Sequence, residues 1–143
     1  MANFDIEELL SALDNESNEK IMKLNKSKIM DHKNNILQRL QLDRSTLKKY
    51  HEKLKDYRYV SDLTDITFGQ YIRWIPLKDV NNIYLTKGAI LCDYKVVNGK
   101  LHILCKSGFG KIFQIKFDEV EIFQKLSQQE KVLLKVLDIL DKN

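Results

Sequence analysis

Residues 91–106, LCDYKVVNGKLHILCK, hold both cysteines of the chain and one of its three histidines. Asn98-Gly99 separates two runs of alternating residues, and this dipeptide is the strongest short signal for a two-residue hairpin, because both turn positions need positive φ. If it forms the loop, the numbers of facing residues sum to 197. Cys92 then faces Cys105 on one apolar face, whose other members are Tyr94, Val96, Leu101 and Ile103.

The same register turns His102 to the opposite, mostly polar face, away from both cysteines. A zinc site of these three residues is therefore not expected, and the chain has no CxxC pair to supply the usual ligand spacing. We predict two buried thiols that act as small hydrophobes. A disulfide is the alternative, since facing residues lie within bridging distance. No metal ligand and no cofactor is predicted.

No nucleophile with a neighbouring base stands out in the sequence. His32 and His51 fall in the helical part, where solvated side chains are expected, and the acids of residues 118–121 are typical of a strand end at the surface. The loop Lys106–Lys111, KSGFGK, lacks the spacing and the flanking helix of a phosphate-binding P-loop and fits a hairpin turn. We therefore predict no catalytic residue and a protein that is not an enzyme.

The chain has 143 residues, a net charge of +4 and 43% hydrophobic residues, enough for one modest core. Residues 1–16 contain five acidic and no basic side chains, whereas residues 17–58 contain 12 Lys and Arg against five Asp and Glu. No run reaches the roughly 18 apolar residues that a membrane span needs, and the acidic beginning is unlike a secretory signal. We expect an intracellular, reducing location and no membrane partner.

Residues 17–57 contain no Gly or Pro and favour helix, either unbroken or broken near Asn34-Asn35 or near residues 43–45. Before them, residues 4–14 (FDIEELLSALD) predict a short amphipathic helix. Asp5, with Glu8 three positions later, is typical of a helix start. A helix this short must pack on its own chain, on another copy or on a partner.

Apolar residues recur at heptad spacing in the second half of the basic part, as in a coiled coil. The same spacing also fits an antiparallel helical hairpin, or a helix of which one side packs on the following domain. The predicted oligomer seam consists of Ile36, Leu40, Leu47, Tyr50, Leu54 and Tyr57.

After Tyr59 the pattern changes to short runs rich in aromatic and β-branched residues, at 65–76, 83–85, 89–97, 100–106 and 111–117. Turn residues separate these runs, which predicts four or five antiparallel strands in a small sheet or barrel. Ser127 and Glu130 form a capping box in sequence before a last helix with a broad apolar face. We expect this helix to cover one open side of the sheet.

The polar face and turns of this sheet carry basic residues with aromatic ones between them. Phosphates take such charge and bases stack on such rings in single-strand and RNA platforms. The same residues also fit an ordinary solvated face or a protein-binding face. The candidate contacts to nucleic acid or to an anion are Arg73, Lys95, Lys100, His102, Lys106, Phe109 and Lys111, with Tyr71 on the same strand as Arg73.

The second half of the chain, from FGQYIRWIPL at residues 68–77 through LHILCKS at 101–107 to the last helix, resembles small uncharacterised proteins of large DNA viruses. Its strand spacing is similar to that of small barrels of the SH3-like or Tudor-like type. The viral resemblance implies a place in a replication factory or particle. Neither resemblance assigns an activity or a site residue.

The sequence thus predicts an α+β protein with an N-terminal helical, coiled-coil-like arm (residues 1–58) and a small β domain with a C-terminal capping helix (residues 59–143). The expected function is a non-catalytic binding or assembly module that self-associates through the arm and presents the β domain to a protein partner. Nucleic-acid binding, to DNA or RNA, through the basic helix and the sheet face is the alternative.

Overall fold

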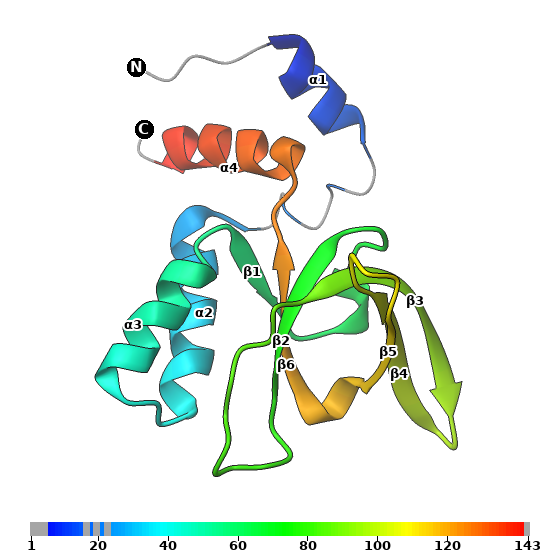
Figure 1. Ribbon diagram of the computed structural model, residues 1–143. Coiled ribbons are helices and arrows are strands. Elements are labelled where there is room, and N and C mark those ends of the chain that lie inside the picture. The colour runs from blue at the N-terminus through cyan, green and yellow to red at the C-terminus, as the bar shows by residue number, and fades with distance from the viewer. Residues whose placement is uncertain (1–5, 16–17, 19–20, 22–23, 142–143) are drawn as a thin grey trace.

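The computed structural model describes residues 6–15, 18, 21 and 24–141 of the chain, so the predicted helix start at Phe4 and Asp5 lies outside the described residues. The predicted α+β class is confirmed (Figure 1). The helices are α1 (Ile6–Asp14), α2 (Lys26–Arg39), α3 (Arg44–Lys53) and α4 (Gln128–Asp141). The strands are β1 (Tyr57–Val60), β2 (Tyr71–Pro76), β3 (Ala89–Val97), β4 (Lys100–Lys106), β5 (Ile112–Lys116) and β6 (Val120–Lys125).

The sheet is open and entirely antiparallel, with six strands in the order β1-β6-β2-β3-β4-β5. Of the two predicted alternatives the antiparallel sheet is confirmed, whereas the barrel and the number of four or five strands are wrong. The sheet is nevertheless curled, because Trp74 of β2 meets Phe113 of β5 edge to face with ring centroids 5.9 Å apart. The predicted run at residues 83–85 forms no strand. Strands β1 and β6 were not predicted. β6 lacks an alternating pattern because three consecutive residues, 122–124, are buried between two covered faces.

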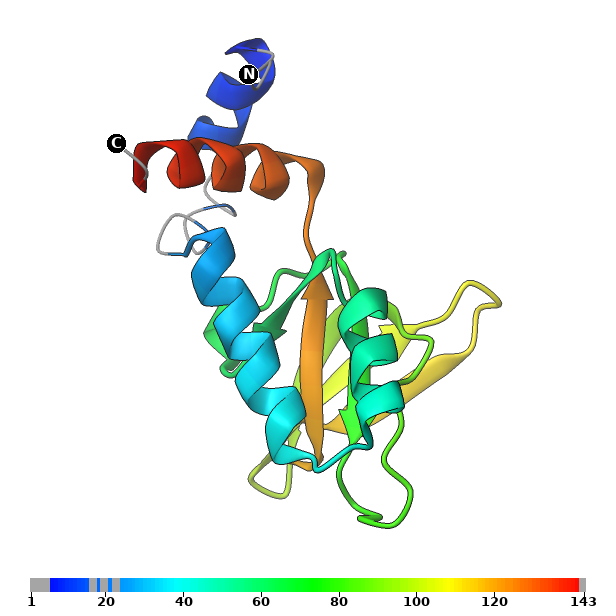
Figure 2. The same ribbon diagram turned by 90° about the vertical axis from the view of Figure 1, so that its left-hand side faces the viewer.

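Apolar residues fill both faces of the sheet. The inner side of the curl holds one cluster around Ile72, Leu91 and Ile103. On the other face, α2 and α3 cover the sheet in front of β1, β6 and β2 (Figure 2). The cluster beneath these two helices includes Leu37, Leu54 and Phe123, all fully buried. The helices therefore belong to the packing of the sheet and do not project as an arm.

The Asn-Gly hairpin forms as predicted, with φ of 53° at Asn98 and 77° at Gly99. Its register follows the predicted pairing only from Val97 back to Asp93, where a β-bulge shifts it by one residue. Leu91 therefore takes the inward place opposite Cys105, and Cys92 is exposed. The prediction of two buried thiols is thus wrong for Cys92 and right for Cys105.

The hairpin also differs from its prediction in which residues it buries. Tyr94 and Val96 lie 46% and 65% exposed, because the tip extends past the core. His102, expected on a solvated face, is buried, and its Nδ1 lies 3.0 Å from the side-chain amide of Gln114.

The last helix begins at the predicted capping box. The Ser127 Oγ accepts from the Glu130 amide, and the Glu130 carboxylate accepts from the Ser127 amide. This helix packs on α1 above one end of the sheet, so the expectation that it covers an open side is wrong (Figures 1 and 2). The predicted boundary between residues 58 and 59 lies inside β1.

Candidate functional site

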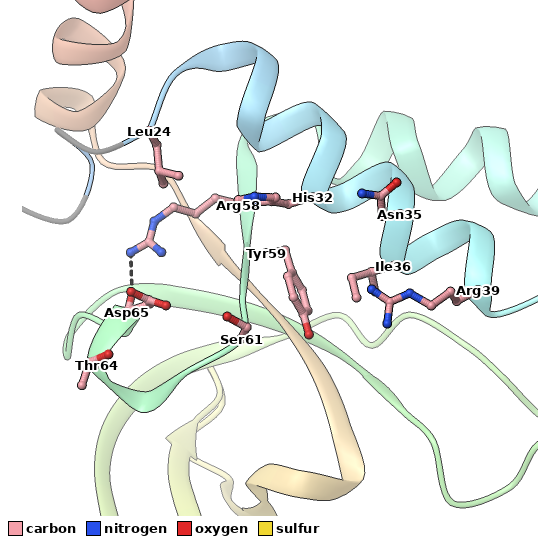
Figure 3. A pocket seen from close by; sticks show the side chains of 10 residues that line it. All are labelled: Leu24, His32, Asn35, Ile36, Arg39, Arg58, Tyr59, Ser61, Thr64 and Asp65. Atoms are coloured by element: carbon pink, nitrogen blue, oxygen red, sulfur yellow. Dashed lines mark hydrogen bonds between the residues drawn. The ribbon is translucent and has the colours of Figure 1, made fainter.

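A groove of about 460 Å³ runs between α2 and strand β1 (Figure 3). Its walls come from three elements: α2, β1 and the 3-10 turn at Leu63–Asp65. Polar groups make up much of its lining. The lining residues are Leu24, His32, Asn35, Ile36, Arg39, Arg58, Tyr59, Ser61, Thr64 and Asp65.

The floor of the groove is the outer edge of the sheet. The Leu126 amide donates to the Asp56 carbonyl at 2.8 Å, and this pair continues the register of β1 with β6. Hydrogen-bonded pairs alternate along antiparallel strands, so Arg58 and Val60 bond to β6. The amide and carbonyl of Tyr59 therefore point away from β6, toward the groove. The groove thus contains backbone groups that a further strand could pair with.

Helix α2 and the side chain of Tyr59 lie on the same side of β1 and together form one wall of the groove (Figure 3). Asn25 caps the start of this helix by accepting from the Lys28 amide at 2.8 Å, and Ile36 anchors it to the sheet. This packing places Arg39 in the last turn beside the groove. The wall therefore presents a guanidinium, whose fork geometry suits carboxylates.

The Tyr59 side chain supplies a hydroxyl to this wall. Burial raises the pKa of Tyr59, and a hydrogen bond with Glu121 raises it further by a smaller amount. The charge of the nearby Arg39 lowers this pKa in part. The phenol therefore stays protonated at neutral pH. Its ring packs against Phe123 with centroids 5.8 Å apart, which fixes its position.

The opposite wall is held by a buried arginine. Arg58 is 3% exposed, and its Nη2 donates to the Asp65 carbonyl at 2.6 Å. Its Nε lies 3.6 Å from a Glu130 carboxylate oxygen and has no hydrogen-bond partner among the described residues. This arginine ties the 3-10 turn and the start of α4 to β1. Its role in the groove is to hold the wall in place, since its charge is already balanced by Glu130.

The predicted seam residues are brought together, but inside this chain. Ile36, Leu54 and Tyr57 are buried in the cluster between the helices and the sheet. The other three, Leu40, Leu47 and Tyr50, are partly buried against the same cluster. The heptad spacing thus reflects the packing of α2 and α3 on the sheet, and packing on the following domain was one of the predicted alternatives. It leaves no free apolar stripe for a second copy at these positions.

The predicted nucleic-acid contacts do not gather into one surface. Lys95 and Lys100 lie toward the tip of the β3–β4 hairpin, whereas Lys106 and the loop with Phe109 and Lys111 lie at the other end of β4. This strand has seven residues, which separates its ends by roughly 20 Å at about 3.3 Å per residue.

Most of these side chains also have partners within the chain. Lys100 lies 3.5 Å from an Asp118 carboxylate oxygen, and the Lys111 ammonium lies 5.0 Å from the centre of the Phe113 ring. Arg73 donates to the Thr86 carbonyl at 2.8 Å. The neighbouring Tyr71 donates its hydroxyl to the Lys87 carbonyl at 2.7 Å. His102 is buried.

Sequence reasoning missed the groove because it assigned Tyr57 to a helical seam and began the sheet too late. The run Tyr57–Val60, YRYV, carries a signal for strand β1, though not for the groove beside it, since aromatic and β-branched residues favour a strand. His32, expected to be a solvated helix residue, is exposed and lines the groove.

The described ranges contain neither a metal-binding cluster nor a helix suited to crossing a membrane. No three side chains of His, Cys, Asp or Glu there could hold a metal ion together. In the same part of the chain, no helix combines the length and the hydrophobicity that crossing a membrane requires. Comparisons with models of protein families, with curated proteins and with solved structures gave no match to this chain.

Proposed function

We propose that this protein is a non-catalytic protein-binding module that takes an extended segment of a partner into the groove beside β1. The observation that carries the proposal is the outward amide and carbonyl of Tyr59 at the floor of that groove. A peptide added to a sheet edge gains affinity from main-chain hydrogen bonds and specificity from pockets for alternate side chains. The groove offers both kinds of contact.

The side chains of the groove favour a segment with an acidic residue. Arg39 is exposed at the groove, whereas the charge of Arg58 is balanced by Glu130. Charge-assisted hydrogen bonds from a guanidinium to a carboxylate are stronger than neutral ones. Asn35, Ser61 and Thr64 add neutral polar groups on both sides of the strand edge, which suits a peptide backbone.

We also propose that the fold is similar to small SH3-like barrels, and the curl of the sheet supports this likeness. The contact of Trp74 with Phe113 brings β2 and β5 together across the inner face. This likeness concerns the fold and carries no function of its own. Nucleic-acid binding has less support, because the basic residues lie at two ends of β4 and several have internal partners.

A displayed library of random octapeptides, selected on the full chain, tests the proposal. We expect enriched peptides to contain an acidic residue and to shift the amide resonances of Tyr59 and Ser61 in the isotope-labelled protein. Arg39→Glu should weaken binding about tenfold or more, the value of one charge-assisted hydrogen bond. Arg44→Glu, the same reversal at an exposed position on α3, is the matched control and should leave binding unchanged.

Ser61→Pro adds a test of strand pairing itself. The alternation of β1 directs the Ser61 amide outward, so proline removes a donor to the peptide without removing a bond to β6. We expect a folded protein by circular dichroism with weakened peptide binding. Peptides whose binding is unaffected by both Arg39→Glu and Ser61→Pro, or shifts confined to the β3–β4 hairpin, would refute the groove as the binding site.

A further inference from the structure

Helix α1 has an apolar stripe that the described part of the chain does not cover. Ile6, Leu10 and Leu13 are 69%, 55% and 50% exposed, and their spacing of four and three residues places them on one side of the helix. A different side packs on α4, where Ala12 is fully buried. The helix is therefore held by its own chain on one side and presents leucines to the surroundings on another.

A second apolar groove, of about 370 Å³, lies between α2 and α4. Ile29, Met30, Leu126 and Leu134 form its apolar lining, and Met30 is 65% exposed. Ile29 and Leu134 belong to the same hydrophobic cluster as Ala12 of α1. The groove is thus an open side of the cluster on which α1 packs, and Figure 2 shows α4 between α1 and the start of α2.

The charges around the stripe and the groove are opposite. Five lysines and one aspartate complete the groove lining. Of these lysines, Lys131 lies 3.6 Å from Asp56, and Lys33 turns inward to donate to the Leu54 carbonyl at 2.9 Å. The remaining three are Lys26, Lys55 and Lys135. On α1, Glu7 and Asp14 stand seven residues apart and border the apolar stripe on one side.

We propose that two copies of this chain form a two-fold dimer in which α1 of each copy lays its apolar stripe into the α2–α4 groove of the other. An amphipathic helix in a hydrophobic groove is a recurring recognition mode. A reciprocal contact of this kind closes on itself, as two-fold dimers do. The occupant is a second copy because the chain itself carries the apolar and acidic helix that a lysine-rimmed apolar groove fits. The dimer surface is separate from the groove beside β1.

A charge-exchange experiment tests the dimer. The first variant, E7K/D14K, makes α1 basic, and the second, K26E/K55E/K135E, makes the groove lining acidic. Light scattering should give wild-type protein twice the chain mass of 16.9 kDa and each variant alone the single mass. An equimolar mixture of the two variants should recover the double mass, because each α1 then meets a groove of opposite charge. Circular dichroism checks that both variants are folded.

Several outcomes would overturn the dimer. One is a wild-type protein of 16.9 kDa at every soluble concentration; another is a mixture of folded variants that stays monomeric. A monomer that co-sediments with phosphatidylglycerol vesicles would assign the lysine-rimmed groove to a lipid surface instead. Arg39→Glu should leave the double mass unchanged, so a failure of the dimer and a failure of peptide binding beside β1 are separate results.

Discussion

At the scale of single residues, one β-bulge determines which of the two cysteines is buried. The Asn98-Gly99 turn fixes the pairing as far as Asp93, and a turn dipeptide carries no information about residues six positions away. The extra residue at Cys92 lets Leu91, a larger apolar side chain, face the core opposite Cys105. Burial of Leu91 contributes more free energy than burial of a thiol, since it removes more apolar surface from water.

The two thiols should differ sharply in reactivity. Cys92 is exposed, whereas Cys105 is 1% exposed, and burial raises its pKa to about 12. Because the thiolate is the reactive form, we expect Ellman's reagent to titrate one thiol per folded chain at pH 8 and two in guanidinium chloride. Cys92→Ser should abolish the reaction of the folded protein. Two rapidly reacting thiols in the folded chain would contradict the bulge.

Gly88, at the entry to β3, should be the glycine least tolerant of substitution. It has φ of 90°, and a Cβ there would collide with the carbonyl oxygen of Ile72 and the ring of Tyr71. Gly110 has φ of 81° but no atom near its Cβ position, so it is the matched control. Gly110→Ala should lower the free energy of unfolding by about 1–2 kcal/mol, the cost of a left-handed residue.

Gly88→Ala should cost more than that, because the collision adds to the left-handed backbone. Urea denaturation of both variants measures the difference. An equal loss in the free energy of unfolding at the two positions would contradict the close contact of Gly88 with Ile72 and Tyr71.

At the scale of elements, the end of α2 shows what sequence patterns leave open. The chain turns between residues 40 and 43 without glycine or proline, and Gln41 takes the left-handed conformation with φ of 54°. A break near residues 43–45 was predicted and is confirmed, since Asp43 caps α3 by accepting from the Thr46 amide at 2.7 Å. The alternative at Asn34-Asn35 is wrong, because α2 continues through both residues.

Gln41→Gly should stabilise the protein, since glycine adopts the left-handed region without steric cost. The free energy of unfolding should rise by up to about 1 kcal/mol. Gln41→Ala is the control and should bring no such gain, because alanine keeps the Cβ that opposes this conformation. Thermal unfolding followed by circular dichroism compares the three proteins. A loss of stability with glycine would contradict the end of α2 as described.

The candidate groove was beyond prediction for a different reason. Its side chains come from α2, β1 and a 3-10 turn, and only tertiary packing brings these elements together. Periodicity identified the apolar residues Ile36 and Leu54 but not what they pack against. The hairpin and the capping box were predictable because each is a local device whose partners lie within a few residues.

At the scale of the whole molecule, α2 and α3 complete one of the cores instead of forming a separate rod. Leu54 is fully buried among residues of α2 and strands β1, β2 and β6. Leu54→Ala should therefore lower the free energy of unfolding by about 2–5 kcal/mol and leave the mass in solution unchanged. Val80→Ala, at a position 79% exposed, is the control and should change stability by less than about 0.5 kcal/mol.

Chemical denaturation and light scattering distinguish this packing from a seam between copies. A seam between copies would make the mass of Leu54→Ala fall while its folded subunits kept their stability. That result would show that Leu54 lies in a contact between copies, as the predicted oligomer seam requires.

Amide hydrogen exchange along β1 tests the central claim, that this strand presents a free edge to a binding groove. In the protein without a partner, we expect slow exchange at Arg58 and Val60, which bond to β6, and fast exchange at Tyr59, whose amide points outward. Nuclear magnetic resonance resolves these three neighbours individually. Protection of the Tyr59 amide equal to that of its neighbours would mean that the edge is already occupied, and the groove would then have no strand to offer a partner.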